Sequence, residues 1–420
     1  MRRTEILVFV ALASVPRAAW PQGGNPLGPE FRVNTFTSQI QSQSSVAGDL
    51  SGNFLVVWQS AVQDGEIYGV FGQRYASSGA PIGPEFRVNT YTTSVQFQPA
   101  VAASVDGSFV VVWRSYGQDG PLIDGIFGQR YASTGVPQGP EFRVNTYTTS
   151  YQYRPRVASD FTGNFVVLWS SRTQDGSGYG VFGQRYGGSG PPLGPEFRVN
   201  TTTPGDQILS DLAADSAGNF VVAWMAEAQD GSGFGVFGQR YANSGATLGS
   251  EFRINSYTTN SQGGASVAID SFGNFVVVWE SYSQDNSNSG IFGQRYSVAG
   301  TPAGPEFRVN TYTTGAQSGP RVASDAAGNF VVIWTSDAQD GSSWGVFGQR
   351  YSASGGPVGP EFRVNTYTTG YQDFPSVGAR GNGDFIVTWD SQAQDGSFHG
   401  VFGQRYGQIF PADLMRFTVE

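Results

Sequence analysis

Side chains capable of acid–base, metal or covalent chemistry are scarce in this sequence. There is one histidine, His399, and there is no cysteine, which excludes disulfides, thiol nucleophiles and thiolate metal sites. All 24 lysine-or-arginine positions are arginine, against 33 acidic residues. Arginines and carboxylates are therefore the charged groups from which a site can be built.

Four arginines occur in one part of the chain, namely Arg114, Arg154, Arg156 and Arg172. Guanidinium groups bind carboxylate and sulfate through paired hydrogen bonds, so this group predicts an anion-binding surface. A set of acidic residues follows later in the chain: Glu227, Glu280, Asp337, Asp373 and Asp390. Ordinary surface variation explains both sets equally well.

Glycoside cleavage needs no histidine if two carboxyl groups lie about 5–9 Å apart across the bond. Asp337 and Asp390 are candidates for such a pair, but no motif in the sequence fixes their separation. The sequence therefore favours a protein that is not an enzyme. A carbohydrate-active enzyme, hydrolase or lyase, that uses arginines and carboxylates of the same surface is the alternative.

A period of 55 residues, with one step of 56, fixes where these side chains lie along the chain. Tryptophan marks it at Trp58, Trp113, Trp169, Trp224, Trp279, Trp334 and Trp389. Phe-Gly-Gln-Arg-Tyr occurs seven times, first at 71–75 and last at 402–406. Glu-Phe-Arg-Val/Ile-Asn also occurs seven times, first at 30–34. Identity at so many positions makes the repeat highly specific.

Each unit contains four short strand patterns, illustrated by the third unit. Its strands A to D are predicted at 155–160, 165–169, 180–186 and 196–201. Strand B is continuously apolar, as expected of a strand that is covered on both faces. Gly163 allows the tight turn between strands A and B, and no segment has a helical period.

Seven such units predict an all-β fold, a seven-bladed β-propeller with four antiparallel strands per blade. A single blade is apolar on both faces, so the blades must pack face to face around an axis, with the tryptophans between them. An open β-solenoid is the rival fold, but its turns are usually shorter than these units.

The ring must be closed by a terminal strand, and two segments compete for that place. Residues 30–35 carry the full strand D motif ahead of the first unit, and residues 416–420 fall in the same register at the other end. We predict that the N-terminal segment closes the ring, because its sequence matches the repeat completely.

Function is expected where the units differ, on the face that carries the B–C and D–A loops. Ten residues after the tryptophan, the units hold Tyr68, Tyr179, Phe234, Ser289, Trp344 and His399, while the second unit has an insertion at 121–124. An arc of exposed rings binds sugars by stacking or anchors a protein partner. The alternative is that each ring packs on its own hairpin. The predicted ligand site comprises Tyr68, Tyr179, Phe234, Trp344 and His399 together with Arg114, Arg154, Arg156 and Arg172.

Residues shared by all units are predicted to be structural, because a sevenfold active site is improbable. In the first unit they are Gln63, Asp64, Arg74, Glu85 and Arg87. The alternative is a Ca²⁺ ion in each B–C loop, bound by Asp64, Asp119, Asp175, Asp230, Asp285, Asp340 and Asp395. One carboxylate per loop is too few for strong Ca²⁺ binding, so we expect no metal and no cofactor.

The N-terminus has the pattern of a secretory signal, with Arg2 and Arg3 ahead of an apolar run at 6–15. We therefore expect a signal and short leader at 1–22 and the propeller at 23–420. No apolar stretch is long enough to span a membrane. The net charge of −9 and the absence of basic runs disfavour nucleic acid. The expected protein is a monomer that is secreted, periplasmic or on the cell surface.

The segment 155–167, Pro-Arg-Val-Ala-Ser-Asp-Phe-Thr-Gly-Asn-Phe-Val-Val, resembles the strand A–turn–strand B core of NHL-type propeller repeats. The whole unit is similar to repeats of large exported bacterial proteins, some of them RTX-like and associated with calcium. The resemblance covers roughly residues 24–420 and carries no catalytic motif. The Gly-Gly-x-Gly-x-Asp run of RTX nonapeptides is missing, so the resemblance implies calcium only weakly.

These observations predict an exported scaffold or binding propeller whose ligand, a polysaccharide or a surface protein, lies on the B–C and D–A loop face. The alternatives are the carbohydrate-active enzyme described above and a structural surface protein stabilised by Ca²⁺.

Overall fold

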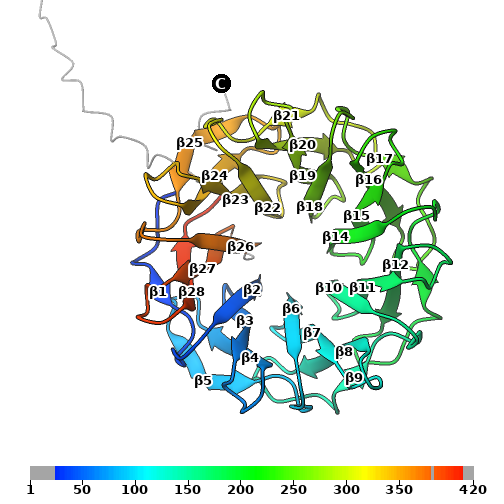
Figure 1. The fold of residues 1–420 in the computed structure, drawn as a ribbon, viewed down its shortest axis with the longest axis vertical. Coiled ribbons are helices and arrows are strands. Elements are labelled where there is room, and N and C mark those ends of the chain that lie inside the picture. Colours follow the sequence, from blue (N-terminus) through cyan, green and yellow to red (C-terminus); the bar gives the residue numbers. More distant parts are fainter. Residues whose placement is uncertain (1–23, 380–382, 410–420) are drawn as a thin grey trace, which may run out of the picture.

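A computed structural model describes residues 24–379 and 383–409, and these residues form a ring of seven four-stranded antiparallel sheets (Figure 1). This confirms the predicted seven-bladed β-propeller. The described residues contain no helix, and hence none that is long and apolar enough to cross a membrane. The predicted signal at 1–22 and the alternative closing segment at 416–420 lie outside the described residues.

The inner strands surround the axis, and the other strands follow outward in order. The inner strands are β2 (Gln41–Gly48), β6 (Gln96–Ala103), β10 (Gln152–Ser159), β14 (Gln207–Ala214), β18 (Gln262–Ile269), β22 (Gln317–Ser324) and β26 (Gln372–Ala379). The second strands are β3 (Phe54–Ala61), β7 (Phe109–Tyr116), β11 (Phe165–Arg172), β15 (Phe220–Glu227), β19 (Phe275–Tyr282), β23 (Phe330–Asp337) and β27 (Phe385–Gln392).

The third strands are β4 (Tyr68–Tyr75), β8 (Asp124–Tyr131), β12 (Tyr179–Tyr186), β16 (Phe234–Tyr241), β20 (Ser289–Tyr296), β24 (Trp344–Tyr351) and β28 (His399–Tyr406). The outer strands are β1 (Phe31–Arg32), β5 (Pro81–Arg87), β9 (Phe142–Arg143), β13 (Phe197–Arg198), β17 (Phe252–Arg253), β21 (Phe307–Arg308) and β25 (Pro357–Arg363). Blades 1 to 6 follow the chain from β2, and blade 7 comprises β26, β27, β28 and β1.

Two strand predictions need correction. The outer strand of blade 3 was predicted at 196–201, but only Phe197–Arg198 pair with β12. Beyond them the side-chain oxygen of Asn200 accepts the Val181 N–H at 2.8 Å, so a side chain takes over from the ladder. The inner strand begins at Gln152 rather than at 155, and a bulge interrupts its pairing with β11 between Tyr153 and Arg156.

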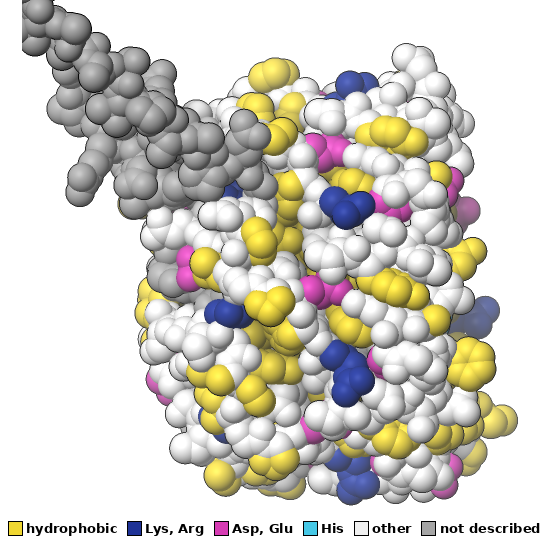
Figure 2. All heavy atoms as spheres, turned by 90° about the vertical axis from the view of Figure 1, so that its left-hand side faces the viewer, with side chains coloured by type: hydrophobic (Ala, Val, Ile, Leu, Met, Phe, Trp, Pro, Cys, Tyr) yellow, Lys and Arg dark blue, Asp and Glu magenta, His cyan; other side chains and the backbone are white. Residues whose placement is uncertain are grey.

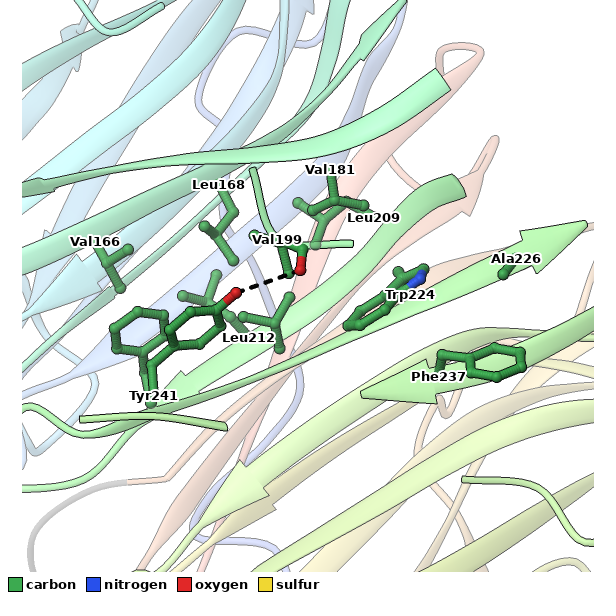
Figure 3. Packing of buried hydrophobic residues seen from close by; sticks show 12 residues of the cluster. Val166, Leu168, Val181, Val199, Leu209, Leu212, Trp224, Ala226, Phe237 and Tyr241 are labelled. Atoms are coloured by element: carbon green, nitrogen blue, oxygen red, sulfur yellow. Dashed lines mark hydrogen bonds between the residues drawn. The ribbon is translucent and has the colours of Figure 1, made fainter. Parts of the chain in front are cut away.

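The core lies between the blades, as predicted. All seven repeat tryptophans are fully buried. Between blades 3 and 4, Val166 and Leu168 of β11 pack with Trp224 of β15 and Tyr241 of β16 (Figure 3). The Tyr241 hydroxyl donates a hydrogen bond to the Val199 carbonyl of blade 3 (Figure 3). Each blade is therefore stabilised by its neighbours rather than by a core of its own.

At each contact between neighbouring blades, here called a joint, a carboxylate of one blade accepts hydrogen bonds from the preceding blade. In blade 1, Glu85 accepts hydrogen bonds from the Thr35 N–H, at 2.7 Å, and from the Thr35 hydroxyl of blade 7. Its other oxygen accepts a bond from Gln63. Arg74 donates to the carbonyls of Ser133 and Thr134 in the next blade. These shared residues are thus structural.

The N-terminal strand closes the ring, as predicted. Phe31 and Arg32 of β1 pair with Gly403 and Phe402 of β28. Glu30 accepts the Thr366 N–H of blade 6 at 2.7 Å, the same contact that Glu251 makes with Thr201. The closing joint is therefore equivalent to the internal ones.

We predict that Glu30→Ala and Glu251→Ala lower the free energy of unfolding by similar amounts, about 1–3 kcal/mol each, because each removes the same set of charge-assisted hydrogen bonds. Chemical denaturation of both variants checks this. A much larger loss for Glu30→Ala would show that the closing joint is the weaker one.

Candidate functional site

The outer wall on the side of blade 7 has a mixed surface. Around blade 7 it mixes arginines, carboxylates and apolar side chains, and no single charge dominates it (Figure 2). Hollows that combine charged and aromatic side chains lie at the axis and on the B–C and D–A loop face, and two more lie beside the A–B turns, between blades 3 and 4 and between blades 5 and 6. The first two contain the predicted arginines Arg154 and Arg156.

A central channel of about 350 Å³ runs between the inner strands. One equivalent residue from each inner strand lines it: Ser45, Ala100, Arg156, Asp211, Ser266, Arg321 and Ser376. Arg156, Asp211 and Arg321 each precede their repeat tryptophan by 13 residues, a signal that identifies them as equivalent. The predicted site included Arg156 but missed Asp211 and Arg321.

A bulge in each inner strand determines which side chains reach the mouth of the channel. In every blade except the fourth a residue of this bulge has a left-handed backbone, with φ of 55° at Arg154 and 49° at Phe374. In blade 1 the Gln43 N–H of this bulge donates to Asp390 of blade 7 at 2.9 Å. In blade 2 the acceptor position holds Arg114, which cannot accept, so the Arg154 N–H bonds to Gln98 instead, at 3.3 Å.

Three guanidinium groups and one carboxylate meet at the channel. Arg154, Arg156 and Arg321 line it together with Asp211, and Arg156 Nε lies 3.9 Å from Asp211 Oδ1. Burial, and then the charge of Arg321, lower the pKa of Arg156 to about 10, while Asp211 opposes this shift. Arg156 therefore remains cationic at neutral pH.

The other two predicted arginines do not join this group. Arg114 forms a two-bonded ion pair with the buried Asp124, at 2.8 and 2.7 Å, and stacks on Phe97. Asp124 was assigned to the insertion at 121–124, but it begins β8 and pairs with Tyr116, the register position that Tyr68 occupies in blade 1. Arg172 is exposed, with its guanidinium carbon 5.9 Å from the Tyr151 ring centre.

The predicted aromatic residues begin the third strands and are half-buried rather than fully exposed. They are Tyr68, Tyr179, Phe234, Trp344 and His399. Tyr179 packs edge-on against Tyr153 with ring centres 4.7 Å apart, so part of its surface is covered by its own blade. Burial lowers the pKa of His399, and the charge of Asp395 partly opposes the shift.

A groove of about 780 Å³ between blades 4 and 5 combines aromatic and polar side chains. Phe234, Tyr282, Glu280, Asn260 and Asn288 line it. Arg154 and Gly264 line both this groove and the central channel, so the two hollows adjoin. Of these residues the predicted site contained only Phe234 and Arg154.

Glu280 and Tyr282 form a titratable pair in the groove. Burial raises the pKa of Glu280, partly offset by hydrogen bonds that involve Tyr282 and Ser289. The charge of Glu280, followed by burial, raises the pKa of Tyr282. A carboxyl group with a raised pKa beside an arginine has the properties of a general acid or base.

A pair of carboxyl groups lies near the channel in blade 7, where Asp373 and Asp390 face each other across β26 and β27. Burial raises the pKa of Asp373 to about 6. Burial, and then the charge of Asp373, raise the pKa of Asp390 well above its ordinary value. Within the described part of the chain, Oδ1 of each has no hydrogen-bond partner.

The aspartates considered above as Ca²⁺ ligands accept hydrogen bonds at their own B–C loops. Asp175, for example, accepts the Ser177 N–H at 3.2 Å and the Asn200 side chain at 3.3 Å. Among residues 24–379 and 383–409, no three His, Asp or Glu side chains converge as a metal site requires.

We predict that Asp390→Asn stabilises the protein at neutral pH by about 1–3 kcal/mol, because it removes a buried charge and keeps an oxygen for the Gln43 N–H. A raised carboxyl pKa means that the folded state binds the proton more tightly than the unfolded state does, so the destabilising effect of the Asp390 charge shrinks as the pH falls below its folded-state pKa and is gone below the ordinary carboxyl pKa of about 4. The melting temperatures of variant and wild type should therefore converge as the pH is lowered from about 7 to about 4. A constant difference across this range would contradict the assignment.

Comparison with known proteins identifies the fold and no family. No protein-family profile matches the sequence, and no curated protein is similar to it. A protein of unknown function from Dyadobacter fermentans has a similar structure, with a TM-score of 0.54 at 10% identity over 90% of this chain and 97% of that chain. An ulvan lyase, from a new family of polysaccharide lyases, gives 0.52 at 10% identity over 90% and 95%.

The β-propeller domain of the Trilobed protease from Pyrococcus furiosus gives a TM-score of 0.50 at 9% identity over 93% and 100%. That domain has an open velcro topology, whereas this ring is closed by β1 pairing with β28. These likenesses support the propeller architecture alone. The NHL-like and RTX-like resemblance therefore stays a prediction.

Proposed function

We propose that this propeller binds a polysaccharide in the groove between blades 4 and 5. The observation that carries the proposal is the lining of the groove, in which the Phe234 and Tyr282 rings lie among the polar side chains of Asn260, Asn288 and Arg154. Aromatic rings stack on the apolar faces of sugars, and amides and guanidinium groups bond to their hydroxyls.

The proposed binding site is smaller than the ligand site that the sequence predicts. The half-buried rings of Tyr68, Tyr179, Trp344 and His399 flank other blades, whereas Phe234 lies beside Tyr282, which is 43% exposed. Of the ligands considered from the sequence, a polysaccharide fits a groove that mixes aromatic rings with amide and guanidinium groups better than a protein surface does. The ulvan lyase is a polysaccharide-acting protein with a similar fold, which is consistent with the proposal.

We predict that replacing both Phe234 and Tyr282 with alanine weakens polysaccharide binding at least about tenfold, because lost ring contacts cost about 1–3 kcal/mol. A glycan array followed by calorimetry on the best ligand measures this. Phe272→Ala is the matched control, since Phe272 is 71% exposed and lies in an A–B turn on the opposite face. Equal binding by the double variant and the wild type would refute the groove.

A carbohydrate-active enzyme is the second candidate, and the Glu280–Tyr282 pair favours it. In this candidate Glu280 moves the proton, and Arg154 stabilises negative charge that develops on the sugar. The sequence favours a protein that is not an enzyme, with a carbohydrate-active enzyme as the alternative, because no spacing brings two carboxyl groups together. In the structure, Glu280, a carboxyl group with a raised pKa, lines a groove that Arg154 also lines.

We predict for this candidate that Glu280→Gln lowers the rate of product formation by at least about a hundredfold while the polysaccharide is still bound, because only proton transfer is lost. Reducing-end release and absorbance of unsaturated products, measured on neutral and uronate polysaccharides, separate hydrolysis from elimination. If the wild type forms no product from any polysaccharide that it binds, the enzyme candidate is rejected and the protein is a binding protein.

A further inference from the structure

The lining of the central channel has more positive charges than negative ones. Arg154, Arg156 and Arg321 line it with Asp211 as the lone acidic lining residue. Among the described residues, neither Arg154 nor Arg321 has a carboxylate within ion-pair distance. The lining therefore has an excess of two positive charges.

Most of the N–H donors of these arginines are unused. Each guanidinium has five. Arg156 gives one to the Pro155 carbonyl at 3.0 Å and Arg321 gives one to the Pro320 carbonyl at 2.8 Å. The guanidinium of Arg154 has no hydrogen bond within the described part of the chain, and it lies 5.7 Å from the centre of the Tyr153 ring. Several donors in a confined space are thus available to oxygen acceptors.

The single acidic group is held away from full pairing. Asp211 Oδ2 accepts the Ser266 hydroxyl at 2.7 Å and the Val267 N–H at 3.2 Å. Its other oxygen lies 3.9 Å from Arg156, beyond hydrogen-bond distance. Asp211 therefore lowers the repulsion among the arginines without occupying their donors.

The two ends of the channel differ in charge. At the far end, the A–B turns place Asp49, Asp160, Asp215, Asp270 and Asp325 around a hollow of about 210 Å³. These carboxylates cap their own turns, as Asp160 does by accepting the Asn164 N–H at 2.9 Å. An anion is repelled at that end and attracted at the end where Arg154 joins the groove.

We propose that the central channel binds one oxyanion, a sulfate ester or carboxylate of an acidic saccharide, through Arg156 and Arg321 with Arg154 at the mouth. The proposal of an oxyanion site follows from the residues that line the channel. Only the proposal that the oxyanion belongs to a saccharide rests on the proposed function. Because Arg154 and Gly264 line both hollows, a chain in the groove is placed to direct an acidic substituent into the channel.

Calorimetry with inorganic sulfate at low ionic strength tests the site directly. We expect Arg321→Gln to weaken sulfate binding about tenfold or more, since a charge-assisted hydrogen bond is lost. Asp211→Asn should tighten it severalfold, because an opposing charge is removed while an oxygen remains for Ser266. Arg172→Gln is the matched control on an exposed arginine, and it should bind as the wild type does.

A purely structural role for the cluster predicts a different pattern, because Asp211→Asn would then lower the melting temperature without tightening the binding of sulfate. That result, or the absence of sulfate binding by the folded wild type, would overturn the proposal. Equal affinities of wild type and Arg321→Gln would also overturn it.

Sulfated, uronate and neutral oligosaccharides of equal length separate this proposal from the groove. Preference for one acidic class that disappears in Arg321→Gln supports the channel and identifies its oxyanion. If sulfate binds with the expected arginine dependence but no saccharide binds, the channel stands and the groove proposal fails. If neutral and acidic saccharides bind equally and Arg321→Gln changes nothing, the channel proposal fails and the groove stands.

Discussion

Burial of both faces of every blade is the constraint on which this structure depends. The second strands begin with a run of five almost wholly apolar residues, such as Phe330–Trp334, and a sheet with such a strand has no face there that can be left in water. A ring covers all of these faces only if the last blade meets the first. The N-terminal strand meets this requirement, and Glu30 makes the same contact with Thr366 as the internal glutamates make with their partners. No disulfide is needed, because every blade has two neighbours.

The joints also explain why polar residues that all units share have structural roles. Glu85, Gln63 and Arg74 are polar or charged and recur in each unit, yet their hydrogen bonds are used at the joints. The positions that vary are the axial residues of the inner strands and the residues around the loops of one face. Arg156, Arg321 and Glu280 occupy such positions, and their equivalents in other blades include serine, alanine and threonine.

The architecture was predictable from the sequence, because identity across the units marks the same structural position seven times. The site was predictable only in part. The sequence singled out Arg154, Arg156 and Phe234, but it grouped Arg114 with them, since nothing in the spacing indicated that Asp124 would pair with it. Arg321 was missed because its neighbours along the chain are ordinary. Only alignment on the tryptophans places it on the axis beside Arg156. The bulge at Arg154 also escaped prediction, since it depends on an acceptor in the preceding blade.

The narrow channel limits which residues can occupy the axial positions of the inner strands, and no such limit applies elsewhere in the ring. Any residue repeated at the axial position of all blades would converge with its copies in one narrow channel. Seven arginines there would repel one another without enough counter-charge, and seven large side chains would not fit. Serine and alanine therefore occupy four of the seven positions, and the charged residues stand at Arg156, Asp211 and Arg321. This departure from the repeat gives the channel an asymmetric charge pattern, and an asymmetric ligand can bind such a channel in a single orientation, which a perfect sevenfold ring would not allow.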